Sequence, residues 1–166
     1  MLIDNGTLNA LINGLIRMLG RRTFLIIPVG MTAFGVLGST MGIFEEVYGL
    51  VPVFAGIAVA LGYDVIVGGA IVFVGVATGF AAATLNPFSV GIAQSIAGVP
   101  MFSGLLFHAA VFVVFQTAAI LYVMWYADRI KKNPEKSVLW GEKTDILPAY
   151  ERREEPITVR QWICIL

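Results

Sequence analysis

The 166 residues carry no net charge, because eleven Lys and Arg residues balance eleven Asp and Glu residues. Hydrophobic residues make up 58% of the chain and charged residues only 13%, whereas a soluble domain usually carries about 25% charged residues. This composition is that of a membrane protein, it indicates no nucleic-acid partner, and the single Cys164 excludes an internal disulfide.

An amphipathic helix is predicted within the N-terminal segment, residues 1–22. Its apolar residues recur at three- and four-residue spacing from Leu8 to Leu19, and the helix ends in Gly20-Arg21-Arg22. It is too short to span a bilayer, so we expect it to lie along the cytoplasmic surface, where basic side chains favour anionic lipid. An ordinary helix packed on protein is the alternative.

The predicted transmembrane region is residues 23–127, and its first part, residues 23–62, is apolar helix with a break in the middle. The break contains Gly38 to Gly42, followed by Glu45 and Glu46. Basic clusters flank the region and should both be cytoplasmic, so an even number of crossings separates them. Either residues 23–62 form a re-entrant hairpin, or they cross twice with both glutamates in an outer loop. We favour the hairpin, because its break is rich in Gly, Ser and Thr.

A second interruption is predicted within residues 65–99, at Thr84-Leu85-Asn86-Pro87. Proline lacks an amide hydrogen and disfavours helical geometry in the residue before it, so a discontinuous transmembrane helix is expected. Asp64, just before this segment, is interpreted as part of a connecting turn. Residues 104–126 then form an uninterrupted span that ends in aromatic and basic residues, as cytoplasmic exits do.

The C-terminal part is predicted to leave the membrane. Residues 128–161 are polar and contain three prolines, which is typical of a cytoplasmic linker. Residues 162–166 are the start of a further apolar segment, too short to span, so we expect a truncated span. The predicted fold class is therefore all-α: a polytopic membrane protein with an interfacial amphipathic helix, a re-entrant helical hairpin and a discontinuous transmembrane helix.

The two breaks supply the candidate binding residues. Interrupting a helix in a bilayer leaves backbone groups that cost several kcal/mol each unless they are paired. Two such interruptions with polar residues therefore indicate a function at the breaks. Secondary transporters use such breaks to hold solutes and ions. Hydroxyl and amide oxygens suited to a hard cation or a substrate amine come from Ser39, Thr40, Thr84, Asn86 and Ser89. The alternative is kinks lined by small residues for packing.

Glu45 and Glu46 are adjacent acids inside the apolar region. Burying a carboxylate within the membrane costs much free energy, so such a residue is first interpreted as functional. It could bind a substrate cation or carry a coupling proton. Exposure at an interface is the alternative. The sequence has no phosphate-binding loop and no His-Glu-x-x-His motif, so an ATP-driven pump or a protease is unsupported and no enzyme activity is predicted.

Three segments resemble the YfcC family of bacterial inner-membrane carriers, in the ion transporter superfamily: Gly38 to Glu46, Ala60 to Asp64, and Gly79 to Ala93. Members of that family are described as basic amino acid (arginine/ornithine-type) antiporters or as four-carbon dicarboxylate carriers. They are much longer than this chain, which resembles the middle of their first half. The resemblance implies a multi-pass protein of the bacterial plasma (inner) membrane.

Related anion carriers hold sodium and substrate at a hairpin tip and a helix break. By similarity, Ser39 and Thr40 fall at the tip, and Thr84, Asn86 and Pro87 at the break. The signature of those anion carriers is absent here, so the coupling ion is either Na⁺ or H⁺, and no cofactor is expected. The expected partners are a small charged organic solute, the lipid bilayer and, for the full-length parent, a second copy in a homodimer.

The leading functional hypothesis is part of a secondary active transporter, a basic amino acid antiporter that works by alternating access. Adjacent acids suit a cationic solute better than a dicarboxylate, since like charge opposes binding. A four-carbon dicarboxylate carrier is the alternative within the superfamily. The alternative of another class is a non-transporting small membrane protein left by truncation.

Overall fold

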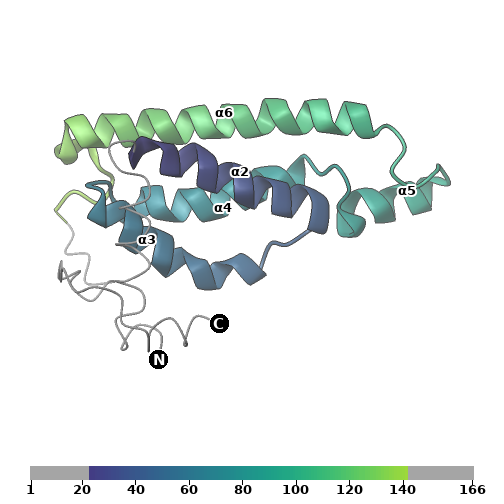
Figure 1. Ribbon diagram of the computed structural model, residues 1–166, viewed down its shortest axis with the longest axis horizontal. Helices are drawn as coiled ribbons and strands as arrows, with labels where there is room; N and C mark the ends of the chain where they lie inside the picture. Colours follow the sequence, from purple (N-terminus) through teal and green to yellow (C-terminus); the bar gives the residue numbers. More distant parts are fainter. Residues whose placement is uncertain (1–22, 142–166) are drawn as a thin grey trace, which may run out of the picture.

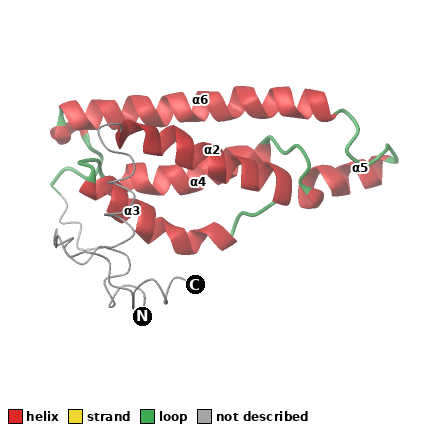
Figure 2. Cartoon of the chain, in the orientation of Figure 1, coloured by secondary structure: helices red, strands yellow, loops and turns green. Residues whose placement is uncertain are grey.

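Helices make up the part of the chain that the computed structural model describes, residues 23–141 (Figure 2). No strand occurs within that range. The elements, in chain order, are η1 (Thr23–Leu25), α2 (Ile26–Met41), η2 (Glu46–Leu50), α3 (Val51–Ala60), α4 (Val65–Ala81), η3 (Pro87–Gly91, a π-helix), α5 (Ile92–Ala97), α6 (Leu105–Lys132) and η4 (Pro134–Lys136). The predicted interfacial helix, most of the polar linker and the last apolar segment lie outside the described residues.

The α4 helix lies at the centre of the bundle and contacts α2, α3 and α6 (Figure 1). The α2 and α3 helices run in opposite directions, so that α3 returns to the end of the bundle where α2 begins. The α4 and α5 helices then lead away from that end, and α6 runs back along the whole bundle. A non-helical stretch, residues 82–86, follows α4, and η3 then leads into α5.

Close packing of α2 on α4 depends on glycines that face each other. A Cβ atom added to Gly79 would collide with the carbonyl oxygen of Gly35, and one added to Gly38 would lie 2.7 Å from the carbonyl oxygen of Val76. Two helix backbones can approach this closely only where no side chain lies between them. Small residues at helix interfaces in membranes permit this close packing. Met31 fills the adjoining core and is fully buried.

Asp64 fixes the turn that joins α3 to α4. One carboxylate oxygen accepts the amide hydrogen of Val67 at 2.9 Å, which caps the first turn of α4. The other oxygen accepts the hydroxyl hydrogens of Tyr126 and Ser137, each at 2.8 Å. The turn is therefore bound to the C-terminal end of α6, in agreement with the connector interpretation.

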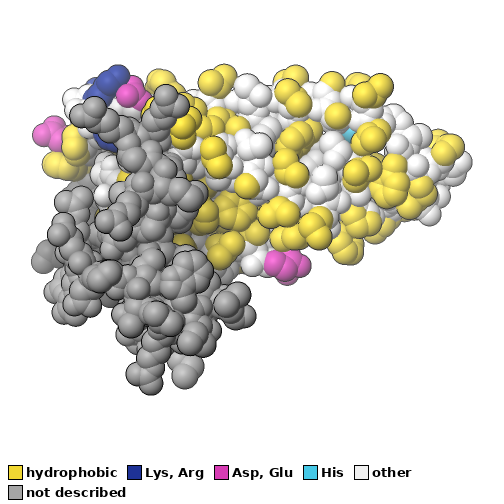
Figure 3. Space-filling model, in the orientation of Figure 1, with side chains coloured by type: hydrophobic (Ala, Val, Ile, Leu, Met, Phe, Trp, Pro, Cys, Tyr) yellow, Lys and Arg dark blue, Asp and Glu magenta, His cyan; other side chains and the backbone are white. Residues whose placement is uncertain are grey.

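Two helical segments are long and apolar enough to cross a membrane, Thr23–Met41 with 19 residues and Leu105–Lys132 with 28. The apolar helices Glu46–Ala60 and Val65–Ala81 are shorter. Hydrophobic side chains spread over the visible face of the bundle, while charged side chains gather at one end, apart from an acidic patch partway along (Figure 3). On α6 the outward side chains Leu106 and Phe107 are 88% and 71% exposed, as a lipid-facing surface requires.

The α6 helix continues to Lys132, past residue 128, where the polar linker is predicted to start. An i,i+4 ion pair of 2.6 Å joins Lys132 to Asp128 and supports the last turn. The helix stops at Asn133, whose φ of −140° is extended, as expected for a residue before proline. Charged residues thus leave the helix intact, and Pro134 ends it.

Candidate functional site

The end of α2 meets the break between α4 and α5. The carbonyl oxygen of Ser39 accepts the amide hydrogens of Thr84 and Leu85, at 3.0 and 3.1 Å. Thr84 and Leu85 follow Ser39 in the sequence by 45 and 46 residues. The carbonyl at the end of one helix and the amides freed by the break in another therefore satisfy each other.

Side chains of Ser39 and Thr84 add to this backbone contact. Their hydroxyl oxygens lie 3.0 Å apart, and the Ser39 hydroxyl also accepts the Thr84 amide hydrogen at 3.1 Å. Ser39 is 1% exposed and Thr84 is 9% exposed. The structure thus brings together two of the residues that the sequence predicted for a site.

Asn86 binds to both elements at the break. Its Nδ2 donates to the carbonyl oxygen of Gly38 at 3.2 Å, and its Oδ1 accepts the amide hydrogen of Phe88 at 2.8 Å. The second bond caps the helical segment that Pro87 begins, where a missing amide hydrogen costs nothing. Asn86 is fully buried, so both of its amide groups are engaged within the protein.

Gly42 permits the close approach of these elements. It ends α2 with a left-handed φ of 73°, which glycine adopts without the strain of a side chain. A Cβ at this position would lie 2.5 Å from Asn86 Oδ1 and 2.7 Å from Phe88 Cδ2. The turn after α2 therefore needs glycine for its backbone angle and for its neighbours.

Two predicted site residues do not join the contact between Ser39 and Thr84. The Thr40 hydroxyl donates to the carbonyl oxygen of Val36 in its own helix, at 2.7 Å. The Ser89 hydroxyl oxygen is buried in η3 and has no hydrogen-bond partner within residues 23–141. The assignment of these two residues to a binding site stays a prediction.

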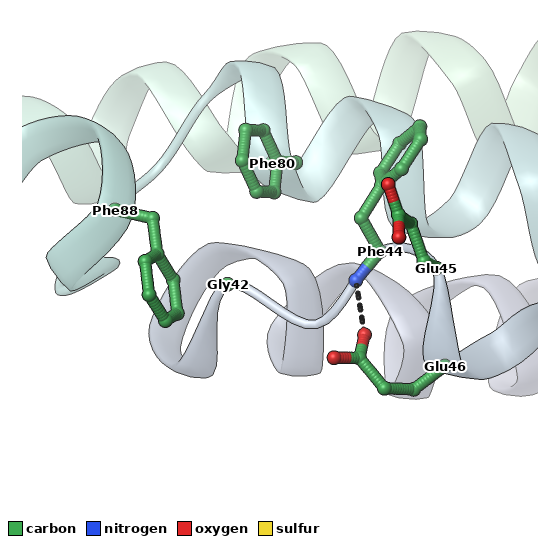
Figure 4. Close-up of a pocket in the computed structure, with 6 residues that line it drawn as sticks. All are labelled: Gly42, Phe44, Glu45, Glu46, Phe80 and Phe88. Carbon is green, nitrogen blue, oxygen red and sulfur yellow. Dashed lines mark hydrogen bonds between the residues drawn. The ribbon is translucent and has the colours of Figure 1, made fainter.

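Both glutamates line a cavity of about 450 Å³ beside the break, together with Gly42 and three phenylalanines, Phe44, Phe80 and Phe88. Figure 4 shows Phe88 on one side of this pocket and the glutamates on the other. The Glu46 carboxylate accepts the amide hydrogen of Phe44 at 3.1 Å. Both glutamate side chains are exposed, so the pocket is open and acidic.

Sequence reasoning missed the phenylalanines of the pocket. The sequence contains eleven phenylalanines, and nothing in it distinguishes those that line the pocket from the others. Gln116 on α6 is buried, donates to the carbonyl oxygen of Met31 and accepts the Thr78 hydroxyl hydrogen, each at 2.6 Å. A glutamine inside an apolar span is typical of such a hydrogen-bonded tie between helices, which was one of the two interpretations that the sequence allowed, contact with a ligand being the other.

Comparison with known proteins identifies relatives over nearly the whole chain. The family model described as DcuC, C4-dicarboxylate anaerobic carrier, matches residues 1–163. An Escherichia coli protein named "Putative basic amino acid antiporter YfcC" is 33% identical over 99% of this chain and 32% of its own length. An uncharacterized Haemophilus influenzae protein is 32% identical over 92% of this chain and 30% of its own length.

This chain therefore spans about a third of the length of these curated relatives. No solved structure matches it. The similarity to the E. coli protein confirms the resemblance to the YfcC family that the sequence motifs indicated. Because the family model covers almost every residue, the chain belongs to the DcuC family of C4-dicarboxylate anaerobic carriers.

Proposed function

We propose that this chain is part of a secondary active transporter that moves a small charged organic solute by alternating access. The observation that carries the proposal is the buried contact of Ser39 with Thr84 and of Gly38 with Asn86, where two interrupted helices meet beside an acidic pocket. Transporters bind solutes and ions at such meeting points of broken helices. Membership of a carrier family supports the same conclusion.

In this proposal the protein crosses the bacterial inner membrane several times, and α2 with α3 forms a re-entrant hairpin. Support comes from the outline of the bundle, because α5 and the loop after it extend beyond the point where α2 ends (Figure 1). The 28 residues of α6 are about 42 Å long, whereas the helical segment Thr23–Met41, with 19 residues, is about 29 Å long. The hairpin thus ends short of the far side, and α4 with α5 forms the discontinuous crossing.

The proposed solute is a basic amino acid, exchanged by antiport. All Lys and Arg residues of the chain lie before Thr23 or after Asp128, and the charged groups of the pocket are the carboxylates of Glu45 and Glu46. A cationic solute is attracted by these carboxylates, whereas an anionic one is repelled. The name of the E. coli relative points to the same class of solute.

A four-carbon dicarboxylate is the second candidate, and the description of the family favours it. A dicarboxylate would need positive partners from outside residues 23–128, because that range contains neither Lys nor Arg. In both cases the coupling ion is Na⁺ or H⁺. The hydroxyls at the break suit Na⁺, and the carboxylates of the pocket suit a proton.

An exchange assay decides between these solutes. The chain, expressed with the sequence that flanks it in its gene, is reconstituted in liposomes loaded with unlabelled arginine, and uptake of labelled arginine or ornithine is measured. We expect uptake that depends on the internal amino acid, as antiport requires. Exchange of labelled succinate without any response to arginine would overturn the basic amino acid assignment. Exchange of neither solute would favour the non-transporting alternative.

Replacement of Asn86 tests whether the contact between the helices supports transport. Asn86→Ala removes the bond to Gly38 and the cap on Phe88, each worth about 1 kcal/mol or more when buried. We expect exchange to fall about tenfold or more, since about 1.4 kcal/mol corresponds to a factor of ten. The matched control is Asn133→Ala, an exposed asparagine after α6. Unchanged exchange by Asn86→Ala would contradict a role for this contact.

A further inference from the structure

The two glutamates of the pocket differ in what they contact. Glu46 is the first residue of η2, where a negative charge is favourable, and its carboxylate holds the Phe44 amide at 3.1 Å. The Glu45 carboxylate forms no hydrogen bond or ion pair with any other residue in the described range 23–141. Glu46 is therefore engaged by the loop, and Glu45 is the carboxylate that can take a solute.

The three phenylalanines also differ. Phe44 packs edge-on against Phe80, with ring centroids 5.5 Å apart, and against Tyr48 at 6.1 Å, so its ring is held in place. Phe88 is 65% exposed and pairs with no other ring in the described part of the chain. Its ring face is thus open to the pocket, and an aromatic face attracts cations.

Phe88 and Glu45 come from the two elements that meet at the break. Phe88 belongs to η3 and is positioned by Asn86, which holds its amide at 2.8 Å, and by Gly42, which leaves room for its ring. Glu45 lies in the connection between α2 and α3, on the opposite side of the pocket (Figure 4). A cation bound between them would contact the hairpin and the broken helix at once.

Resting on the carrier function proposed above, we propose that the Glu45 carboxylate and the Phe88 ring together bind the cationic group of the solute and select for positive charge. Glu46 is a positioning residue that holds the loop carrying Glu45. The chemistry of the pair suits a guanidinium or ammonium group, because such a group forms charge-assisted bonds with carboxylates and is attracted to aromatic faces.

Arginine and citrulline provide the probe for charge selection, because citrulline has nearly the shape of arginine without the positive charge. In the proteoliposome exchange assay, Glu45→Gln should raise KM for arginine about tenfold and reduce the preference for arginine over citrulline by a similar factor. Phe88→Leu should raise KM for arginine roughly threefold to tenfold, and Phe88→Trp should restore it, as expected of a cation over a ring. Glu46→Gln should lower the exchange rate and leave the preference for arginine unchanged.

The controls are Glu135→Gln, an exposed carboxylate after α6, and Phe107→Leu, an exposed ring on the outer face of α6. If Glu45→Gln does not insert, Glu45→Asp keeps the charge but shortens its reach, and it should show an intermediate KM. If both Glu45→Gln and Phe88→Leu exchange arginine with the KM of the wild type and with its preference for arginine over citrulline, this inference is overturned. The carrier function would still stand. Failure of the wild-type protein to exchange any basic amino acid would overturn both.

Discussion

At the scale of single residues, the contact between α2 and the break is formed by buried, closely packed residues. Ser39 and Asn86 are 1% and 0% exposed, and each is bonded to the opposite element. Gly42 lies against Asn86 with no space for a methyl group. Small changes here should therefore have larger effects than the same changes elsewhere in the chain.

Gly42→Ala is the sharpest test of this packing, because Gly62 provides a matched control. Both glycines have left-handed φ angles, 73° and 82°, but a Cβ on Gly62 would meet nothing within 4 Å. Gly62→Ala should therefore cost about 1 kcal/mol of unfolding free energy, the usual strain of a left-handed residue. Gly42→Ala should cost a further 1–3 kcal/mol, roughly the range for overpacking. Thermal unfolding in detergent measures both, and equal losses would contradict the contact with Asn86.

At the scale of elements, one buried side chain joins three helices. Gln116 of α6 bonds to Met31 of α2 and Thr78 of α4. Gly35 makes this possible, because a Cβ there would lie 2.6 Å from the glutamine amide. Helices α2 and α4 are therefore both fixed to the same long helix, α6.

Gln116→Leu should reduce the unfolding free energy by about 0.6–1.7 kcal/mol, the range for hydrogen bonds between membrane helices. The loss is modest because the Thr78 hydroxyl can still donate to the carbonyl oxygen of Val74, which lies 2.7 Å away. Thr117→Leu is the control, since Thr117 is the next residue on α6 and is exposed. Denaturant titration in mixed micelles gives the comparison, and a Gln116→Leu protein more stable than wild type would contradict the tie.

At the scale of the whole molecule, the proposed arrangement places the basic end of α6 in the cytoplasm and the loop before α6 outside. The basic end contains Arg129, Lys131 and Lys132, and positive residues favour the cytoplasmic side. Lys131 lies over the Tyr63 ring at 4.6 Å, so the α3–α4 turn is at the same end. The hairpin should then begin and finish in the cytoplasm.

Cysteine accessibility tests this arrangement, after native Cys164 is replaced by serine. An impermeant maleimide should label Lys136→Cys only from the cytoplasmic side and Ser103→Cys only from outside. Thr40→Cys should react slowly from either side, because the proposed hairpin places the end of α2 within the bilayer, where the adjoining irregular backbone must be shielded by protein. Labelling of Thr40→Cys from outside as fast as Ser103→Cys would show that α2 and α3 cross the membrane. Rapid labelling of both Thr40→Cys and Asn86→Cys would show that these positions lie in bulk water outside the bilayer, and it would contradict a binding site at the breaks.

The positions of the breaks could be predicted from the sequence because glycine and proline act on the backbone locally. Asn86-Pro87 marked the second break, and Gly42 the end of α2. The site could be predicted only in part, because successive helical residues point about 100° apart. Of the neighbours Ser39 and Thr40, only Ser39 faces the break, and the sequence does not say which one does.

The contact of Ser39 with Thr84 and Leu85 has a consequence for how the protein can vary. Two of its links join main-chain atoms, at 3.0 and 3.1 Å, so nearly every amino acid at position 84 or 85 supplies the amide hydrogen that they need. Only proline there lacks the hydrogen that the link requires. Side chains around this joint can therefore change while the main-chain connection between α2 and the stretch after α4 is kept.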